Sequence, residues 1–138
     1  MGIFDKLSGS KDIQLTPKGA LALAAMTMIG IDGAIEDEEV DTLRRVVRGD
    51  GNAFDQAYKV YKDKSIQECV QLVSKSLDDK QKVAVITNLL DIAMADGMLA
   101  GAEKDLMMLY LDSLKVSEEI VKDIVDVIAV KNDFSIFG

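Results

Sequence analysis

Apolar residues recur along most of the chain at intervals of three and four, rather than in strict alternation with polar ones. This spacing gathers apolar side chains on one face of a helix, whereas a half-buried strand needs an alternating pattern. The sequence therefore predicts an all-α fold. Residues 19–31 carry no charge, and the run is shorter than the roughly 20 residues that a membrane-spanning helix needs. It predicts a buried core helix.

Cap and turn signals place the first two helices. Thr16 followed by Pro17 is typical of a helix start, because threonine caps the first backbone N–H groups and proline lacks one. This first helix is expected to end near Gly33. A second helix is predicted to begin at the acidic run 36–39 and to stop before the turn-forming segment RGDGN, 48–52.

Five more helices follow from similar signals. Asn52 is predicted to cap the third helix, and Ser65 with Glu68 forms a capping-box pattern that opens the fourth. The last three are expected over about 79–95, 102–114 and 117–130, with Ser117 as the final cap. Short connections between about seven helices predict a compact bundle.

Length and composition fit one globular domain over residues 1–138, with mobile tails expected at 1–12 and 131–138. The chain has 138 residues, of which 49% are hydrophobic and 29% charged, enough to bury a core without disulfides. Its single cysteine, Cys69, falls on an apolar helical face and is predicted to be a core thiol in a reducing compartment. No secretory signal or membrane-spanning segment is visible, so a cytoplasmic location is expected.

The net charge of −8 and isoelectric point near 4.5 oppose binding to nucleic acid, because contacts with phosphate require cations. Arg44, Arg45 and Arg48 form a local basic group. They lie near the end of the second predicted helix, where positive charge stabilises the helix dipole. Surface stabilisation explains them better than readout of a nucleic acid.

A short acidic motif occurs twice. IDGAIEDEEVD, 31–41, aligns with ADGMLAGAEKD, 95–105, so that Asp32, Gly33 and Glu39 match Asp96, Gly97 and Glu103. Each copy follows an apolar helix and opens another, which predicts two pseudo-symmetric halves. Glutamates in the first turn of a helix need no ligand, since they favour the positive end of its dipole. The aspartates instead sit at helix C-termini, where negative charge is unfavourable and a nearby cation would relieve it.

The motif also suggests a cation site, although it is not an EF-hand, because the first half of the calcium loop lacks oxygen ligands. Carboxylates shared by the two copies suit Ca²⁺, Mg²⁺ or Mn²⁺, whereas a chain without histidine is unsuited to structural zinc. The candidate ligands are Asp32, Glu36, Glu39, Asp96 and Glu103. Two other interpretations of the acidic cluster remain open, namely a solvated helix start and a surface for a basic partner.

Three segments resemble the bacterial tellurite-resistance TerB-like family: MGIFDKL at the start, IDGAIEDEE, and LDIAMADGMLAGAEKDL in the second half. The resemblance implies an all-helical domain of two related halves, no catalytic activity and a divalent-cation site of acidic residues. It also implies protein partners in a membrane-associated stress-response complex at the inner face of the membrane. The second loop departs from the acidic pattern, with Ala100, Gly101 and Ala102 opposite Glu36, Asp37 and Glu38.

The leading hypothesis is therefore a cytoplasmic TerB-like module whose acidic face binds a divalent cation or a basic partner. One alternative is a metal-independent scaffold, in which the motifs only join helices. The other is a small carboxylate-dependent enzyme, which a chain without histidine or a phosphate-binding loop supports poorly.

Overall fold

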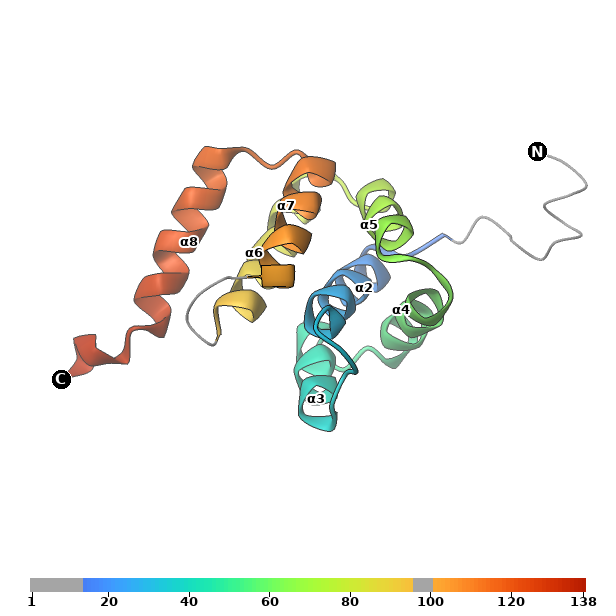
Figure 1. Cartoon of the computed structure of the whole chain (residues 1–138), viewed down its shortest axis with the longest axis horizontal. Helices are drawn as coiled ribbons and strands as arrows, with labels where there is room; N and C mark the ends of the chain where they lie inside the picture. Colours follow the sequence, from blue (N-terminus) through green and yellow to red (C-terminus); the bar gives the residue numbers. More distant parts are fainter. Residues whose placement is uncertain (1–13, 96–100) are drawn as a thin grey trace, which may run out of the picture.

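The computed structural model describes residues 14–95 and 101–138, and within them the chain is helical, without strands (Figure 1). The predicted all-α fold is confirmed. Seven α-helices and one short 3₁₀ helix, η1, lie in the described part of the chain. Their bounds are α2 Pro17–Gly30, α3 Asp37–Val46, α4 Gly51–Asp63, α5 Ile66–Lys75, α6 Asp79–Met94, α7 Gly101–Leu114, α8 Glu118–Asn132 and η1 Phe134–Phe137.

Helix α2 is the centre of the bundle and corresponds to the uncharged run of the sequence. It starts as predicted, with Thr16 Oγ1 accepting a hydrogen bond of 3.0 Å from Gly19 N and with Pro17 at the first position. Helices α3, α4, α5, α6 and α7 all contact it (Figure 1). A helix that is apolar on every side needs burial on every side, and the middle of α2 has it: residues 19–28 are buried except for the half-buried Leu21.

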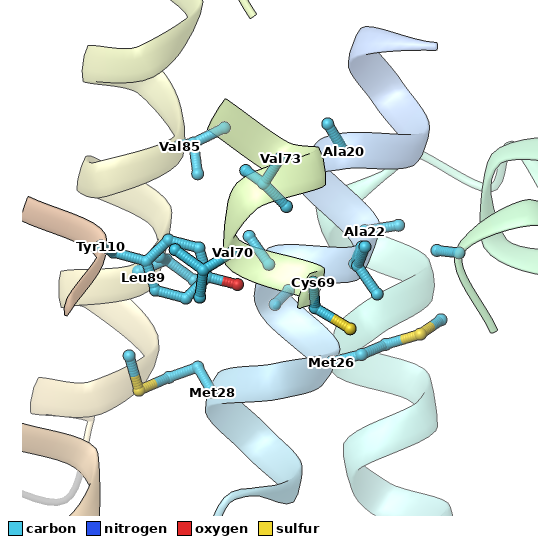
Figure 2. Packing of buried hydrophobic residues seen from close by; sticks show 14 of the residues in the cluster. Ala20, Ala22, Met26, Met28, Cys69, Val70, Val73, Val85, Leu89 and Tyr110 are labelled. Atoms are coloured by element: carbon cyan, nitrogen blue, oxygen red, sulfur yellow. The ribbon is translucent and has the colours of Figure 1, made fainter. Parts of the chain in front are cut away.

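The core consists of apolar side chains from all seven α-helices, with α2 and α6 as its main contributors (Figure 2). Four alanines on α2 let the neighbouring helices approach closely, and Met26 and Met28 fill the space between them. Cys69 is completely buried in this core, which confirms the predicted core thiol. Burial raises the pKa of Cys69 to about 11, so the thiol stays protonated at neutral pH.

One polar pair crosses the core. Tyr110 Oη on α7 lies 2.6 Å from Thr27 Oγ1 on α2, and both side chains are fully buried. The Thr27 hydroxyl donates to Ala24 O at 2.7 Å, so the Tyr110 hydroxyl is the donor in the contact between the two helices. The two hydroxyls satisfy each other and fix the register of α7 on α2.

Most helix boundaries agree closely with the sequence expectations, but α2 ends at Gly30 rather than near Gly33, and the cap of α4 differs. The cap of this helix is Asp50 rather than Asn52, because Asp50 Oδ1 accepts from Ala53 N at 3.1 Å. Asn52 instead lies inside the first turn. Asp50 also pairs with Lys18 Nζ at 3.4 Å, a contact with α2 that local sequence patterns do not reveal. The Ser65 and Glu68 capping box of α5 is present as predicted.

Helix α8 lies at the edge of the bundle and packs on α6 (Figure 1). Lys131 Nζ lies 2.8 Å from Asp91 Oδ1, and Asn132 Nδ2 donates to Met94 O at 3.3 Å, so two polar contacts hold the end of α8 to α6. The helix therefore extends two residues past the expected end at Val130, into the segment 131–138 that was expected to be a tail. In η1 the rings of Phe134 and Phe137 meet edge to face at 5.6 Å and stay exposed.

None of the helices in the described part of the chain is long and apolar enough to cross a membrane. The expected pseudo-symmetry of two halves stays a prediction, because residues 96–100 of the second motif lie outside the described residues.

Candidate acidic pocket between two helix junctions

A polar pocket of about 440 Å³ opens where α2 gives way to α3 and where α6 and α7 approach the same end of the bundle. Both predicted motifs contribute to its wall, although they are far apart in sequence. The lining residues are Met28, Ile29, Asp32, Gly33, Ala34, Glu36, Glu39, Ile92 and Glu103.

The turn after α2 depends on two glycines. Gly33 has a φ of +151°, a conformation that favours glycine, and its N–H donates to Gly30 O at 3.1 Å. Gly30 is needed for another reason, because a Cβ there would collide with Tyr61 Oη of α4. The two glycines let the chain turn sharply over Tyr61 and direct residues 32–36 toward the pocket.

The start of α3 gives the acidic run a structural role. Asp37, Glu38 and Glu39 occupy the first turn of the helix, where its partial positive charge favours carboxylates. Glu39 Oε1 accepts a hydrogen bond of 2.9 Å from Glu36 N, so this side chain already satisfies a backbone donor at the helix start. Glu39 would contribute to helix stability even without a ligand.

The pocket brings together four of the five predicted ligands, Asp32, Glu36, Glu39 and Glu103. Asp96, the fifth, lies outside the described residues. Across 14–95 and 101–138, no three acidic or cysteine side chains converge closely enough to hold a metal ion. The pocket carboxylates therefore share one concave surface, but they do not form a ready-made coordination shell.

The sequence interpretation missed the apolar part of this wall. Met28, Ile29 and Ile92 line the pocket beside the carboxylates. The sequence did contain a signal for these residues, because apolar residues end both helices just before each Asp-Gly motif. Asp91 of α6 does not line the pocket and forms an ion pair with Lys131 of α8.

The methionines divide between core and surface. Met26, Met28 and Met107 are buried in the core. Met108 is 60% exposed and lies on the outer side of α7.

The fold and the pocket define a class of protein, a small all-helical domain with an acidic pocket formed where two helix junctions meet. A family profile described as "Tellurite resistance protein TerB" matches residues 18–125, which span both junctions. The chain belongs to the TerB family, as its motifs predicted. Comparison with curated proteins and with solved structures finds no match.

Proposed function

We propose that this TerB-family domain acts by binding, and that its acidic pocket takes up a divalent cation. TerB-family domains are generally non-enzymatic, which favours a binding role over a catalytic one. The observation that carries the proposal is the meeting of Asp32, Glu36 and Glu39 from the first motif with Glu103 from the second in one pocket.

Electrostatics supplies the mechanism. Carboxylates that share a small pocket repel one another, and a cation between them would replace that repulsion with attraction. Oxygen ligands alone suit Ca²⁺, Mg²⁺ or Mn²⁺. Because the described carboxylates do not converge, binding requires them to move inward or to hold the ion through its water shell. Coordination would then tie the α2–α3 junction to α7, and binding would stabilise the fold.

A basic side chain of a protein partner is the second candidate ligand. A pocket of about 440 Å³ is far larger than a bare ion, and Met28, Ile29 and Ile92 give it an apolar wall. A lysine or arginine could lay its aliphatic stem on that wall and place its charge among the carboxylates. Such a partner would fit a stress-response complex of the tellurite-resistance type, cytoplasmic and peripheral to the membrane, as the resemblance implies.

Calorimetry and thermal melts test the cation proposal. Protein treated with EDTA is titrated with Ca²⁺, Mg²⁺ and Mn²⁺, and one of them is expected to raise the melting temperature. A cation present at about 100 times its Kd adds about 2.7 kcal/mol to the free energy of unfolding. The Asp32→Asn, Glu103→Gln double variant should lose the shift, while Glu118→Gln, Glu119→Gln, a matched neutralisation at the start of α8, should keep it.

The other hypotheses give different results in the same experiment. If no cation changes the melt but a lysine-rich peptide binds the wild type and not the Asp32 and Glu103 variant, the pocket serves a basic partner. If neither ligand binds, the metal-independent scaffold is the better description. Turnover of a substrate that disappears in this variant would instead favour the carboxylate enzyme.

A further inference from the structure

Helix α3 carries its surface charges in two blocks of opposite sign. Its first half exposes Asp37, Glu38 and Asp41, and its end exposes Arg44, Arg45 and Arg48. The core side of the helix is marked by Leu43, which is buried together with the following Val47. At about 100° per residue, Asp37, Glu38, Asp41 and Arg45 fall on the side opposite Leu43. Both blocks therefore face solvent.

These charges have no ion-pair partners within the described part of the chain. The ion pairs found there join Lys18 to Asp50 and Lys131 to Asp91, and neither involves α3. Arg45 Nη2 donates to Thr42 Oγ1 at 3.3 Å, which keeps one guanidinium edge on the helix and leaves other N–H groups available.

The helix dipole explains which end of α3 carries each sign, but the surface of α8 shows that it does not require separate blocks. Helix α8 also begins with two glutamates and has a lysine in its last turn. Between those ends, Lys122, Asp123 and Asp126 mix the two signs. The separation of positive and negative charges into two blocks is therefore a property of the α3 surface that α8 does not share.

Side chains of α4 extend the basic end of α3 into a fixed strip. The Arg44 guanidinium lies 5.1 Å from the centre of the Phe54 ring, which stacks on Tyr58 at 6.3 Å. Lys62 Nζ lies over Tyr58 at 4.9 Å. Tyr58 is 43% exposed and adds apolar surface beside the positive charges. A cation held over an aromatic face loses less freedom on binding an anion than one on a mobile side chain.

We propose that this face of α3 is a self-complementary docking surface, and that its occupant is α3 of a second copy of the chain in antiparallel orientation. A two-fold axis close to Asp41 and Thr42 would place Asp37 and Glu38 of each copy opposite Arg45 and Arg48 of the other. It would also bring the two Asp41 side chains near each other, and their repulsion opposes the pairing. Every contact would then occur twice, and the pairing would close at a dimer, as an isologous interface does. Parallel pairing would instead set like charges against each other.

The balance of charges predicts a weak, salt-sensitive dimer. Two chains of net charge −8 repel each other, and exposed ion pairs contribute little individually. The local attraction must overcome that repulsion at short range, within a Debye length of about 8 Å at physiological salt. This inference does not use Asp32, Glu39 or Glu103, so it can fail or succeed independently of the cation pocket.

Sedimentation velocity of the full chain at low and high salt provides the first test. A concentration-dependent dimer is expected at about 50 mM NaCl, with a Kd at least about tenfold weaker at 500 mM. A chain that stays monomeric at low salt up to millimolar concentration, or a dimer that salt does not weaken, would overturn the proposal.

Charge reversal then identifies the surface and its orientation. Asp37→Lys, Glu38→Lys reverses two charges of the acidic block and leaves Asp41 in place, and Arg45→Glu, Arg48→Glu reverses two charges of the basic block and leaves Arg44 in place. Each variant alone should be monomeric, and an equimolar mixture of the two should form a heterodimer. Two matched controls should dimerise like the wild type: Glu118→Lys, Glu119→Lys in the first turn of α8, and Lys75→Glu, Lys115→Glu. Lys115 matches Arg48 because both residues end a helix with a φ of +56°.

Circular dichroism melts confirm that each variant is folded before its oligomeric state is read from sedimentation. A mixture of two folded variants that stays monomeric, or a folded single variant that still dimerises as tightly as the wild type, would show that α3 is not the interface.

Discussion

Helices α2 and α8 have similar lengths but opposite environments (Figure 1). Nine residues of α2 are buried, whereas α8 buries Ile128 alone and exposes Val127 and Val130. The difference follows from composition, because α2 has no charged residue after Lys18 and α8 has several on its outer face. Stability is therefore concentrated at the centre of the bundle. Substitutions in the edge helix α8 are expected to lower the free energy of unfolding less than substitutions in α2.

The largest effect is expected at the centre. Leu23→Ala removes a side chain with no exposed surface from the central helix, and the five helices that contact α2 limit how far the core can collapse into the cavity. The free energy of unfolding should fall by about 3–5 kcal/mol, measured by urea denaturation at neutral pH. Ile128→Ala on α8 is the comparison, with an expected loss of about 2 kcal/mol because an edge helix can shift to fill the gap. Equal losses at the two sites would contradict the contrast between the helices.

A smaller effect is expected at the polar pair that joins α2 to α7. Tyr110→Phe removes the donor to Thr27 Oγ1 but leaves the bond from Thr27 to Ala24 O intact. The variant should lose about 1–2 kcal/mol at neutral pH, measured by the same denaturation.

The same pair makes the loss depend on pH. Burial raises the pKa of Tyr110 above its usual value of 10.0. Below that value the neutral hydroxyl contributes its full stabilisation, and above it the unfolded chain ionises first and the contribution decreases. The difference between wild type and Tyr110→Phe should therefore shrink between about pH 9 and pH 11. Cys69 is common to both proteins, so its own titration cancels. A difference that stays constant or grows with pH would show that Tyr110 is not a neutral buried donor.

The smallest effect is expected on the outer face of α8. Val127 is 68% exposed and Val130 60%, so Val127→Ala, Val130→Ala removes little buried surface. The change in the free energy of unfolding should stay within about 0.5 kcal/mol per site. A loss of several kcal/mol in the free energy of unfolding would mean that this face of α8 is buried against another molecule in solution. A melting temperature that rises with protein concentration would then identify that molecule as a second copy of the chain.

Much of the fold could be predicted from local patterns. Thr16, Pro17, Ser65 and Ser117 marked helix starts correctly, because a cap acts through the backbone of its own first turn. The cap of α4 was misassigned since Asp50 and Asn52 are both good caps and only the geometry of the turn chooses between them. That geometry includes Lys18 of α2, which is distant in sequence and contacts Asp50.

The candidate site was predictable in part. The sequence indicated Asp32, Glu36, Glu39 and Glu103 as candidate ligands of one site, and the structure places all four on one pocket. Their binding of a cation stays a prediction. Sequence could not give the distances among their oxygens. Those depend on side-chain rotamers, and Glu39 turns its carboxylate toward the backbone of Glu36, which no spacing rule encodes.

The sequence by itself determined the helices, the burial of α2 and the membership of the TerB family, because periodicity, caps and motifs act over a few residues. Tertiary structure alone decided that two distant junctions share a pocket and that α3 lies at the surface with both charge blocks exposed. Proximity between residues far apart in sequence is set by how whole helices pack. That packing minimises exposed apolar surface over the entire chain and not within any one segment.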